Sequence, residues 1–80
     1  MKTHKQYLAQ VRIASFPNEW LNANLYSGGR KPYLLTLDKA KAAVEAMRNR
    51  YPGDQSMSVI DSRIHVREVT DWEELDENPA

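Results

Sequence analysis

The segment from Thr36 to Asp54, TLDKAKAAVEAMRNRYPGD, constrains the fold more than any other part of the chain. Its apolar residues recur every three or four positions, which is the spacing of one face of an α-helix. These residues are Leu37, Ala40, Ala43, Val44, Met47 and Tyr51. Thr36 suits the N-cap position, and Pro52 disfavours helical backbone in the residue before it. The pattern predicts an amphipathic helix that begins after Thr36, ends before Pro52 and packs its apolar face on a core.

Two segments before this helix alternate between apolar and polar residues, which is the pattern of a half-buried strand: residues 7–13 and 20–26. Residues 16–19, which contain a proline and an asparagine, indicate a turn between the two strands. Residues 27–30 contain two adjacent glycines, which suit the positive φ angles of a tight hairpin turn. We therefore expect a third strand at residues 33–36, immediately before the helix.

Two further strand-like segments follow the helix, at residues 57–60 and 64–69. They form either one long strand with a bulge or a short hairpin, and the sequence does not decide between these. Thr70 to Glu73 matches a capping box, which predicts a short helical turn that packs Trp72 and Leu75 on the body.

The predicted fold class is α+β, with the element order β-β-β-α-β. An antiparallel sheet of three to five strands carries one amphipathic helix on one face. We expect residues 1–69 to form a single domain and residues 70–80 to form a short acidic C-terminal segment. A chain of 80 residues has no room for a second core.

Composition excludes several classes of function. The chain has no cysteine, so disulfides, thiolate metal sites and a cysteine nucleophile are excluded, and a reducing cytoplasm fits. No apolar run approaches the roughly 20 residues of a membrane span, so we expect a cytoplasmic protein. His4 and His65 are isolated and lack the spacing of metal ligands. Because no catalytic signature is present either, we expect no enzyme, no metal and no cofactor.

The net charge of zero conceals two oppositely charged parts. Residues 1–67 contain all eleven lysines and arginines but only five acidic residues, whereas residues 68–80 contain six acidic residues and no cation. The acidic segment has three interpretations: a solvated end, a decoy that imitates nucleic acid, or a cover over the basic part. The first is the simplest, because six negative charges are few for a nucleic-acid mimic.

The glycines of Ser27 to Tyr33, SGGRKPY, raise the question of a phosphate-binding loop. Such a loop needs a longer glycine-spaced run that ends in Lys-Ser or Lys-Thr directly before a helix, and that run is absent. We therefore expect the segment to be a hairpin tip that presents Arg30 and Lys31 to a partner.

The sheet face opposite the predicted helix is the principal candidate for function. Strand alternation places cations and aromatic residues together on this face, a combination typical of protein-binding hot spots and of nucleic-acid stacking surfaces. The residues of this face are Gln10, Arg12, Trp20, Asn22, Asn24, Tyr26, Arg63, His65 and Arg67. The predicted partner surface consists of Arg12, Trp20, Tyr26, Arg30, Lys31, His65 and Arg67.

We expect the partner to be a larger protein or a ribonucleoprotein, because the acidic segment cancels the basic charge. DNA binding through the same face is the alternative. Self-association is also open, because an edge strand can pair with its twin.

Two resemblances bear on these hypotheses. Trp20, Gly28-Gly29, Thr36, Ala40 and Ala43 resemble the three-strand-plus-helix domains of phage integrase arm-binding modules and plant ethylene-response-type factors. That resemblance implies a sheet that lies in the DNA major groove. The chain departs from it at Asn22, Asn24 and Leu34, where those families are rich in arginine and lysine.

In size, composition and element order, the chain also resembles small phage and prophage accessory proteins. Some of those proteins inhibit host defence complexes such as CRISPR effectors. This second resemblance implies an anti-CRISPR-like inhibitor but assigns a role to no individual residue.

Overall fold

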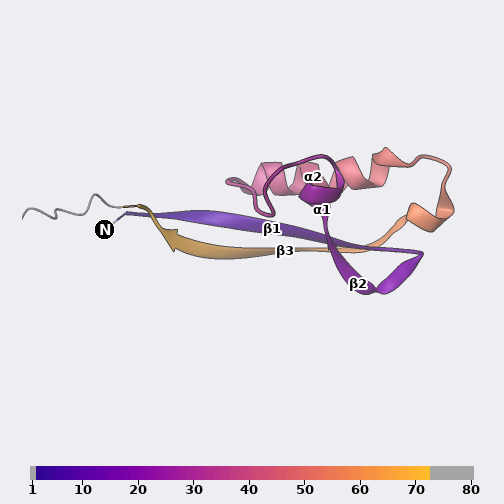
Figure 1. Ribbon diagram of the computed structural model, residues 1–80, viewed down its shortest axis with the longest axis horizontal. Coiled ribbons are helices and arrows are strands. Elements are labelled where there is room, and N and C mark those ends of the chain that lie inside the picture. Colours follow the sequence, from indigo (N-terminus) through magenta and orange to yellow (C-terminus); the bar gives the residue numbers. More distant parts are fainter. Residues whose placement is uncertain (1, 73–80) are drawn as a thin grey trace, which may run out of the picture.

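In the computed structural model, which describes residues 2–72, the strand β1 (Thr3–Ile13) lies at the centre of an antiparallel three-stranded sheet. The strands β2 (Phe16–Asn22) and β3 (Val59–Thr70) flank it on opposite sides. The helix α2 (Leu37–Arg50) packs on one face of this sheet (Figure 1). The predicted α+β class, an antiparallel sheet with one amphipathic helix on one face, is confirmed.

The pairing of β1 with β3 is the longest contact in the fold. It runs in continuous register from Thr3 opposite Thr70 to Arg12 opposite Asp61, and the register shifts before Ile13, which lies opposite Val59. Residues 59–70 therefore form one strand with an irregularity near its start, and the hairpin alternative is wrong. Residues 55–57 form a short 3-10 helix, η1 (Gln55–Met57), so the strand begins later than the sequence pattern indicated.

The core lies between β1 and α2 and combines alanines with a few larger apolar side chains. Alternate residues of β1 turn their side chains toward the helix and are fully buried: Ala9, Val11 and Ile13. The helix contributes the buried residues Ala40, Ala43, Val44 and Met47. Because two of these are alanines, the helix backbone can approach the sheet closely.

The predicted ends of the helix agree with the structure. The Thr36 hydroxyl accepts a hydrogen bond from the Lys39 amide at 3.1 Å, as expected of an N-cap. Leu37 and Tyr51, at the two ends of the predicted apolar stripe, remain 42% and 38% exposed. The buried part of the stripe is therefore confined to the middle of the helix.

The predicted turn at residues 16–19 is wrong, because these residues belong to β2. The chain reverses instead at Ala14 and Ser15. Their amides donate to the carbonyl oxygens of Ser58 and Ser56, at 3.0 and 2.9 Å. Hydrogen bonds to residues distant in the sequence therefore place the chain reversal before Phe16, earlier than Pro17 indicated.

The predicted strand at residues 20–26 ends at Asn22. The Asn22 side chain accepts a hydrogen bond from the Leu25 amide at 3.2 Å and so caps a short helix, α1 (Ala23–Tyr26). Gly28 has a positive φ of 100°, and the Gly29 amide donates to the Asn24 carbonyl oxygen at 2.7 Å. The two glycines thus end a helix, and the predicted hairpin turn is wrong.

The predicted strand at residues 33–36 is also wrong, and with it the element order β-β-β-α-β. Only Leu34 pairs with the sheet: its amide and carbonyl groups both bond to those of Tyr7, at 2.8 Å. Two residues later Thr36 caps α2, which leaves no length for a strand.

Trp72 does not pack on the body as predicted, because its side chain is fully exposed. The Asp71 amide donates to the Lys2 carbonyl oxygen at 2.9 Å, so the chain continues the β1–β3 pairing where a capped turn was expected. Glu73 and Leu75, the other residues of that prediction, lie outside the described residues.

Removal of Met47 from the core should destabilise the fold strongly. Met47 is 1% exposed, and truncation of a buried methionine to alanine typically costs about 2–5 kcal/mol. We expect Met47→Ala to lower the free energy of unfolding by about that amount in urea denaturation. Leu35→Ala, at a residue that is 58% exposed, serves as the control and should change it by less than about 0.5 kcal/mol. Equal effects of the two substitutions would contradict this placement of the core.

Candidate functional site

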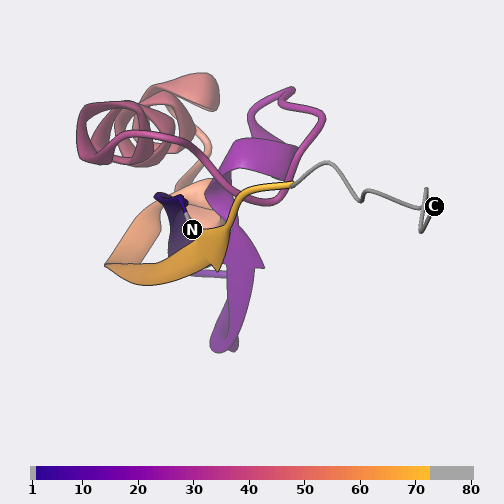
Figure 2. The ribbon, with the colours of Figure 1, turned by 90° about the vertical axis from the view of Figure 1, so that its left-hand side faces the viewer.

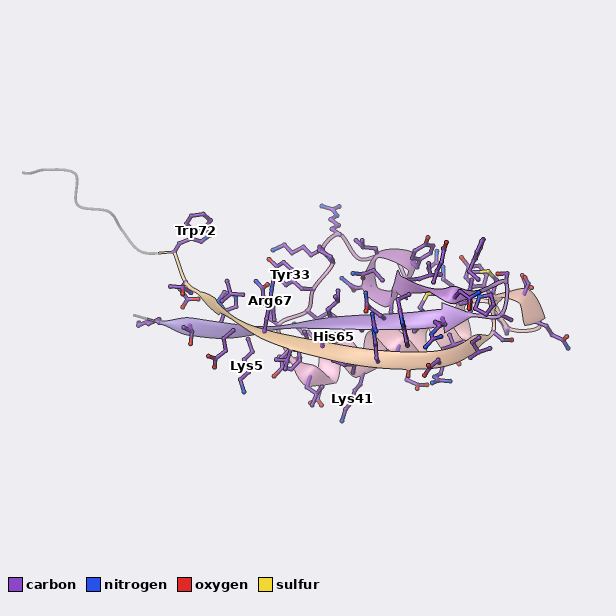
Figure 3. The ribbon with its side chains drawn as sticks, turned by 90° about the horizontal axis from the view of Figure 1, so that it is seen from below. Lys5, Tyr33, Lys41, His65, Arg67 and Trp72 are labelled. Atoms are coloured by element: carbon purple, nitrogen blue, oxygen red, sulfur yellow. The ribbon has the colours of Figure 1, made fainter. Side chains whose placement is uncertain are left out.

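The sheet face away from α2 is uncovered by any described helix (Figures 1 and 3). We call it the open face. In Figure 3, which looks from below, β1 and β3 run in front of α2. Because side chains alternate along a strand, the residues between the core positions of β1 lie on this face, together with their partners on β2 and β3. The open face comprises Gln6, Leu8, Gln10, Arg12, Trp20, Asp61, Arg63, His65 and Arg67.

Trp20 and two arginines form the first cluster on the open face. The guanidinium carbons of Arg12 and Arg63 lie 4.3 and 4.1 Å from the centroid of the Trp20 ring. Arg12 also forms an ion pair with Asp61 at 3.3 Å, and Arg63 donates to the Gln10 side-chain oxygen at 2.7 Å. Cation–π contacts and a neighbouring polar group thus hold each guanidinium in place.

Gln6 is the centre of the second cluster. It is buried, and its side-chain oxygen accepts two hydrogen bonds from Arg67, from Nε at 3.0 Å and from Nη2 at 2.8 Å. Its amide nitrogen therefore donates, to His4 Nε2 at 3.2 Å. Because that imidazole nitrogen accepts, His4 Nδ1 carries the proton that bonds to the Asp71 carboxylate. One chain of hydrogen bonds thus extends from the end of β3 to Arg67.

A hollow of about 240 Å³ opens beside Arg67. Residues of β1, of β3 and of the loop before α2 line it: Gln6, Tyr7, Leu8, His65, Val66, Arg67, Pro32 and Tyr33. Figure 3 shows the labelled Tyr33, His65 and Arg67 at this part of the sheet. Its lining is mainly apolar, while Arg67 keeps Nη1 without a hydrogen bond to any described residue. The hollow can therefore receive an apolar side chain that carries or adjoins an acceptor.

The structure brings together four of the seven residues of the predicted partner surface: Arg12, Trp20, His65 and Arg67. It separates the other three from them. Tyr26 belongs to α1, and Arg30 and Lys31 belong to the loop that follows; Figure 2 shows that this part of the chain lies on the same side of the sheet as α2. Lys31 nevertheless reaches the edge of the site, because its Nζ lies 5.7 Å from the centroid of the Tyr33 ring, which lines the hollow.

Sequence reasoning missed Gln6, Leu8 and Tyr33. Gln6 and Leu8 share the alternation of Gln10 and Arg12, so an earlier start of the strand would have included Gln6. Lys5 is charged at a position where the alternation requires an apolar residue. The pattern therefore did not indicate that the strand starts before Tyr7. Leu8 was a usable signal, because it is the only apolar residue that the predicted strand turns toward the polar face. No local signal placed Tyr33, which depends on the bridge between Tyr7 and Leu34.

Guanidinium groups and an aromatic ring dominate the chemistry of the open face. Within residues 2–72, no three histidine or acidic side chains gather in a way that could hold a metal ion. No helix in the same part of the chain is long and apolar enough to cross a membrane. The face offers guanidinium donors held in fixed positions, an indole ring and one hollow.

Comparisons with protein-family models, with curated proteins and with solved structures found no match to this chain.

The stacking of Arg63 on Trp20 should be measurable as a coupling energy. In a double-mutant cycle with Arg63→Met and Trp20→Leu, we expect a favourable coupling of about 0.5–1 kcal/mol, the usual magnitude of a solvent-accessible cation–π pair. The free energy of unfolding of the four proteins in urea gives this value. A cycle of Arg48→Met with Trp20→Leu is the control and should show no coupling, because Arg48 lies on α2. A coupling of zero for Arg63 would contradict the stacked arrangement.

Proposed function

We propose that this protein is a small interaction module that binds an acidic surface of a larger protein or ribonucleoprotein through the open face. The observation that carries the proposal is the hollow beside Arg67, which adjoins an uncovered array of fixed guanidinium groups. Binding hot spots are enriched in arginine and tryptophan, and an anchor side chain seated in a pocket commonly dominates the affinity.

Hydrogen bonds within the protein prepare the arginines for binding. Gln6 fixes Arg67 and Gln10 fixes Arg63 before any partner arrives. Immobilising a long side chain on binding costs about 0.5–1.5 kcal/mol, so prior fixation of these side chains removes part of that cost. Arg67 Nη1 makes no hydrogen bond to a described residue and so remains available to a partner.

The charge of the open face indicates the chemistry of the partner. The face carries the guanidinium groups of Arg12, Arg63 and Arg67, and the two described carboxylates bonded to its residues, Asp61 and Asp71, are already paired with Arg12 and His4. Complementarity therefore favours carboxylates opposite Arg63 and Arg67. An acidic segment with an apolar side chain for the hollow would satisfy both features.

A larger partner whose surface is occupied in this way would be blocked from its other ligands. The similarity in size and composition to small phage accessory proteins supports an inhibitor of this kind, directed at a host complex. In this proposal the protein acts by covering a surface and performs no reaction.

Nucleic-acid binding is the second candidate, since three guanidinium groups on one face also suit a phosphate backbone. The stacking of Trp20 argues against base recognition, however, because two guanidinium groups already engage its ring. Asn22 and Asn24 cannot read bases from this face either. Asn22 caps α1 and donates to the Pro32 carbonyl oxygen, and Asn24 lies within α1 and donates to the Lys31 carbonyl oxygen.

The proposed function predicts that changes on the open face abolish partner capture. We expect Arg67→Glu and Tyr33→Ala each to reduce the partner recovered from a bacterial lysate by about tenfold or more, as loss of a hot spot does. Lys39→Glu makes the same charge change on α2, and Leu35→Ala removes an exposed apolar side chain outside the hollow. Both controls should retain the partner, with binding quantified by mass spectrometry. Equal recovery by all four variants would overturn the site assignment.

Titration of mixed-sequence duplex DNA at two salt concentrations separates the two candidates. Binding that weakens steeply with salt and is lost in Arg63→Glu would support the nucleic-acid alternative. Absence of binding at low salt would exclude it and leave the protein partner.

A further inference from the structure

The outer edge of β3 pairs with no strand in the described part of the chain. The strand is 12 residues long, is paired only with β1, and contains neither proline nor lysine. Natural proteins protect long edge strands with proline, with charged residues and with bulges, because the free backbone groups can pair with another chain; β3 has charged residues and an irregular start, but no proline interrupts its regular part. This edge is therefore open to strand addition.

The residues that carry the free backbone groups follow from the pairing of Tyr7. Both backbone groups of Tyr7 bond to Leu34, so they do not bond to Val66, which lies opposite on β3. In an antiparallel pair such non-bonded positions alternate with bonded ones, and their amide and carbonyl groups point away from the partner strand. The backbone groups of Val66, and equally those of Ser62 and Ile64, thus point to the open edge.

Charge identifies the second copy of this chain as a partner that fits. If two β3 strands pair antiparallel about a two-fold axis at Ile64, Asp61 of each copy lies opposite Arg67 of the other, on the open face. Arg63 then lies opposite His65, and no two like-charged residues face each other. The paired stretch is the part of β3 whose register with β1 is unbroken.

The neighbouring two-fold registers are unfavourable. An axis at residue 63 places Arg63 opposite Arg63 of the second copy, and an axis at residue 67 does the same for Arg67. An axis at residue 65 places Arg63 opposite Arg67 of the second copy. An axis at Val66 places Asp61 opposite Asp71. An axis at residue 62 pairs a shorter stretch that includes the irregular start of the strand. Like charges directly opposite each other destabilise a sheet, so Ile64 is the preferred centre.

The helix side of the same edge provides a matching hollow. A space of about 390 Å³ lies between α2 and β3, lined by Lys41, Val44, Glu45, Arg48, Ser62 and Ile64. In the register about Ile64, Val66 of the second copy lies opposite Ser62 and therefore at this hollow. Val66 is 59% exposed in the single chain, and pairing would cover it in both copies at once.

We propose that two copies of this chain pair through their β3 strands, about a two-fold axis at Ile64, to form one continuous six-stranded sheet. Such an interface is isologous, so each contact occurs twice. The inference does not rest on the proposed function, because it concerns the isolated protein and is tested without a partner.

Charge exchange across the axis tests this register. Asp61→Arg and Arg67→Asp should each raise the dimer dissociation constant by about tenfold or more, since each replaces two attractive pairs with two repulsive ones. An equimolar mixture of the two variants should form a heterodimer, because each of the two facing pairs then joins an arginine of one variant to an aspartate of the other. The double variant should recover a homodimer, because its two exchanged charges again face opposite charges. Sedimentation equilibrium over a range of concentrations measures all of these.

Glu19→Arg, a charge reversal on β2, is the matched control and should dimerise like the unchanged protein. Circular dichroism establishes that each single variant is folded, and recovery in the mixture requires both to be folded. A monomeric unchanged protein, single variants that still dimerise, or a mixture that stays monomeric would each overturn the proposal. Tyr33→Ala should dimerise normally, so loss of partner binding in that variant tests the proposed function separately.

Discussion

The antiparallel pairing of β1 with β3 is the interaction on which the rest of the structure depends. It joins the first described strand to the last, from Thr3 opposite Thr70 to Ile13 opposite Val59, and so closes a loop that contains every other described element. Closure of a long loop is entropically costly, and the buried core and the strand pairing together offset that cost. The side-chain bonds across the two strands, Gln10 to Arg63 and Gln6 to Arg67, therefore act in the fold as well as in the site.

The sequence predicts the elements whose causes are local. The helix α2 is such an element, because its cap at Thr36 and its apolar spacing lie within one segment. The third strand and the hairpin turn failed because their signals fit two structures equally well. Gly28 supplies the same positive φ at the end of a helix as it would in a turn. The Asn22 side chain caps α1 and so selects the helix over the hairpin.

The candidate site shows the same division. Arg12, Trp20 and Arg67 could be assigned to one face because strand alternation requires only the correct period. Tyr26 was assigned through a strand that ends before it, and Arg30 and Lys31 through a hairpin that does not form. The hollow could not be predicted, since it exists only where a loop residue, Tyr33, meets two strands that are distant in the sequence.

The two surfaces that lack a covering element meet at Arg67, which lines the hollow of the open face and lies opposite Asp61 of the second copy in the proposed dimer. Strand addition at β3 extends the sheet within its own plane, whereas a partner on the open face approaches perpendicular to it. Paired residues of antiparallel strands turn their side chains to the same face, so a dimer about Ile64 would place both α2 helices on one side and both open faces on the other. The two hollows would then face the same direction. A partner with two acidic segments, or a symmetric partner, would engage both at once and gain affinity from the linkage without any new contact.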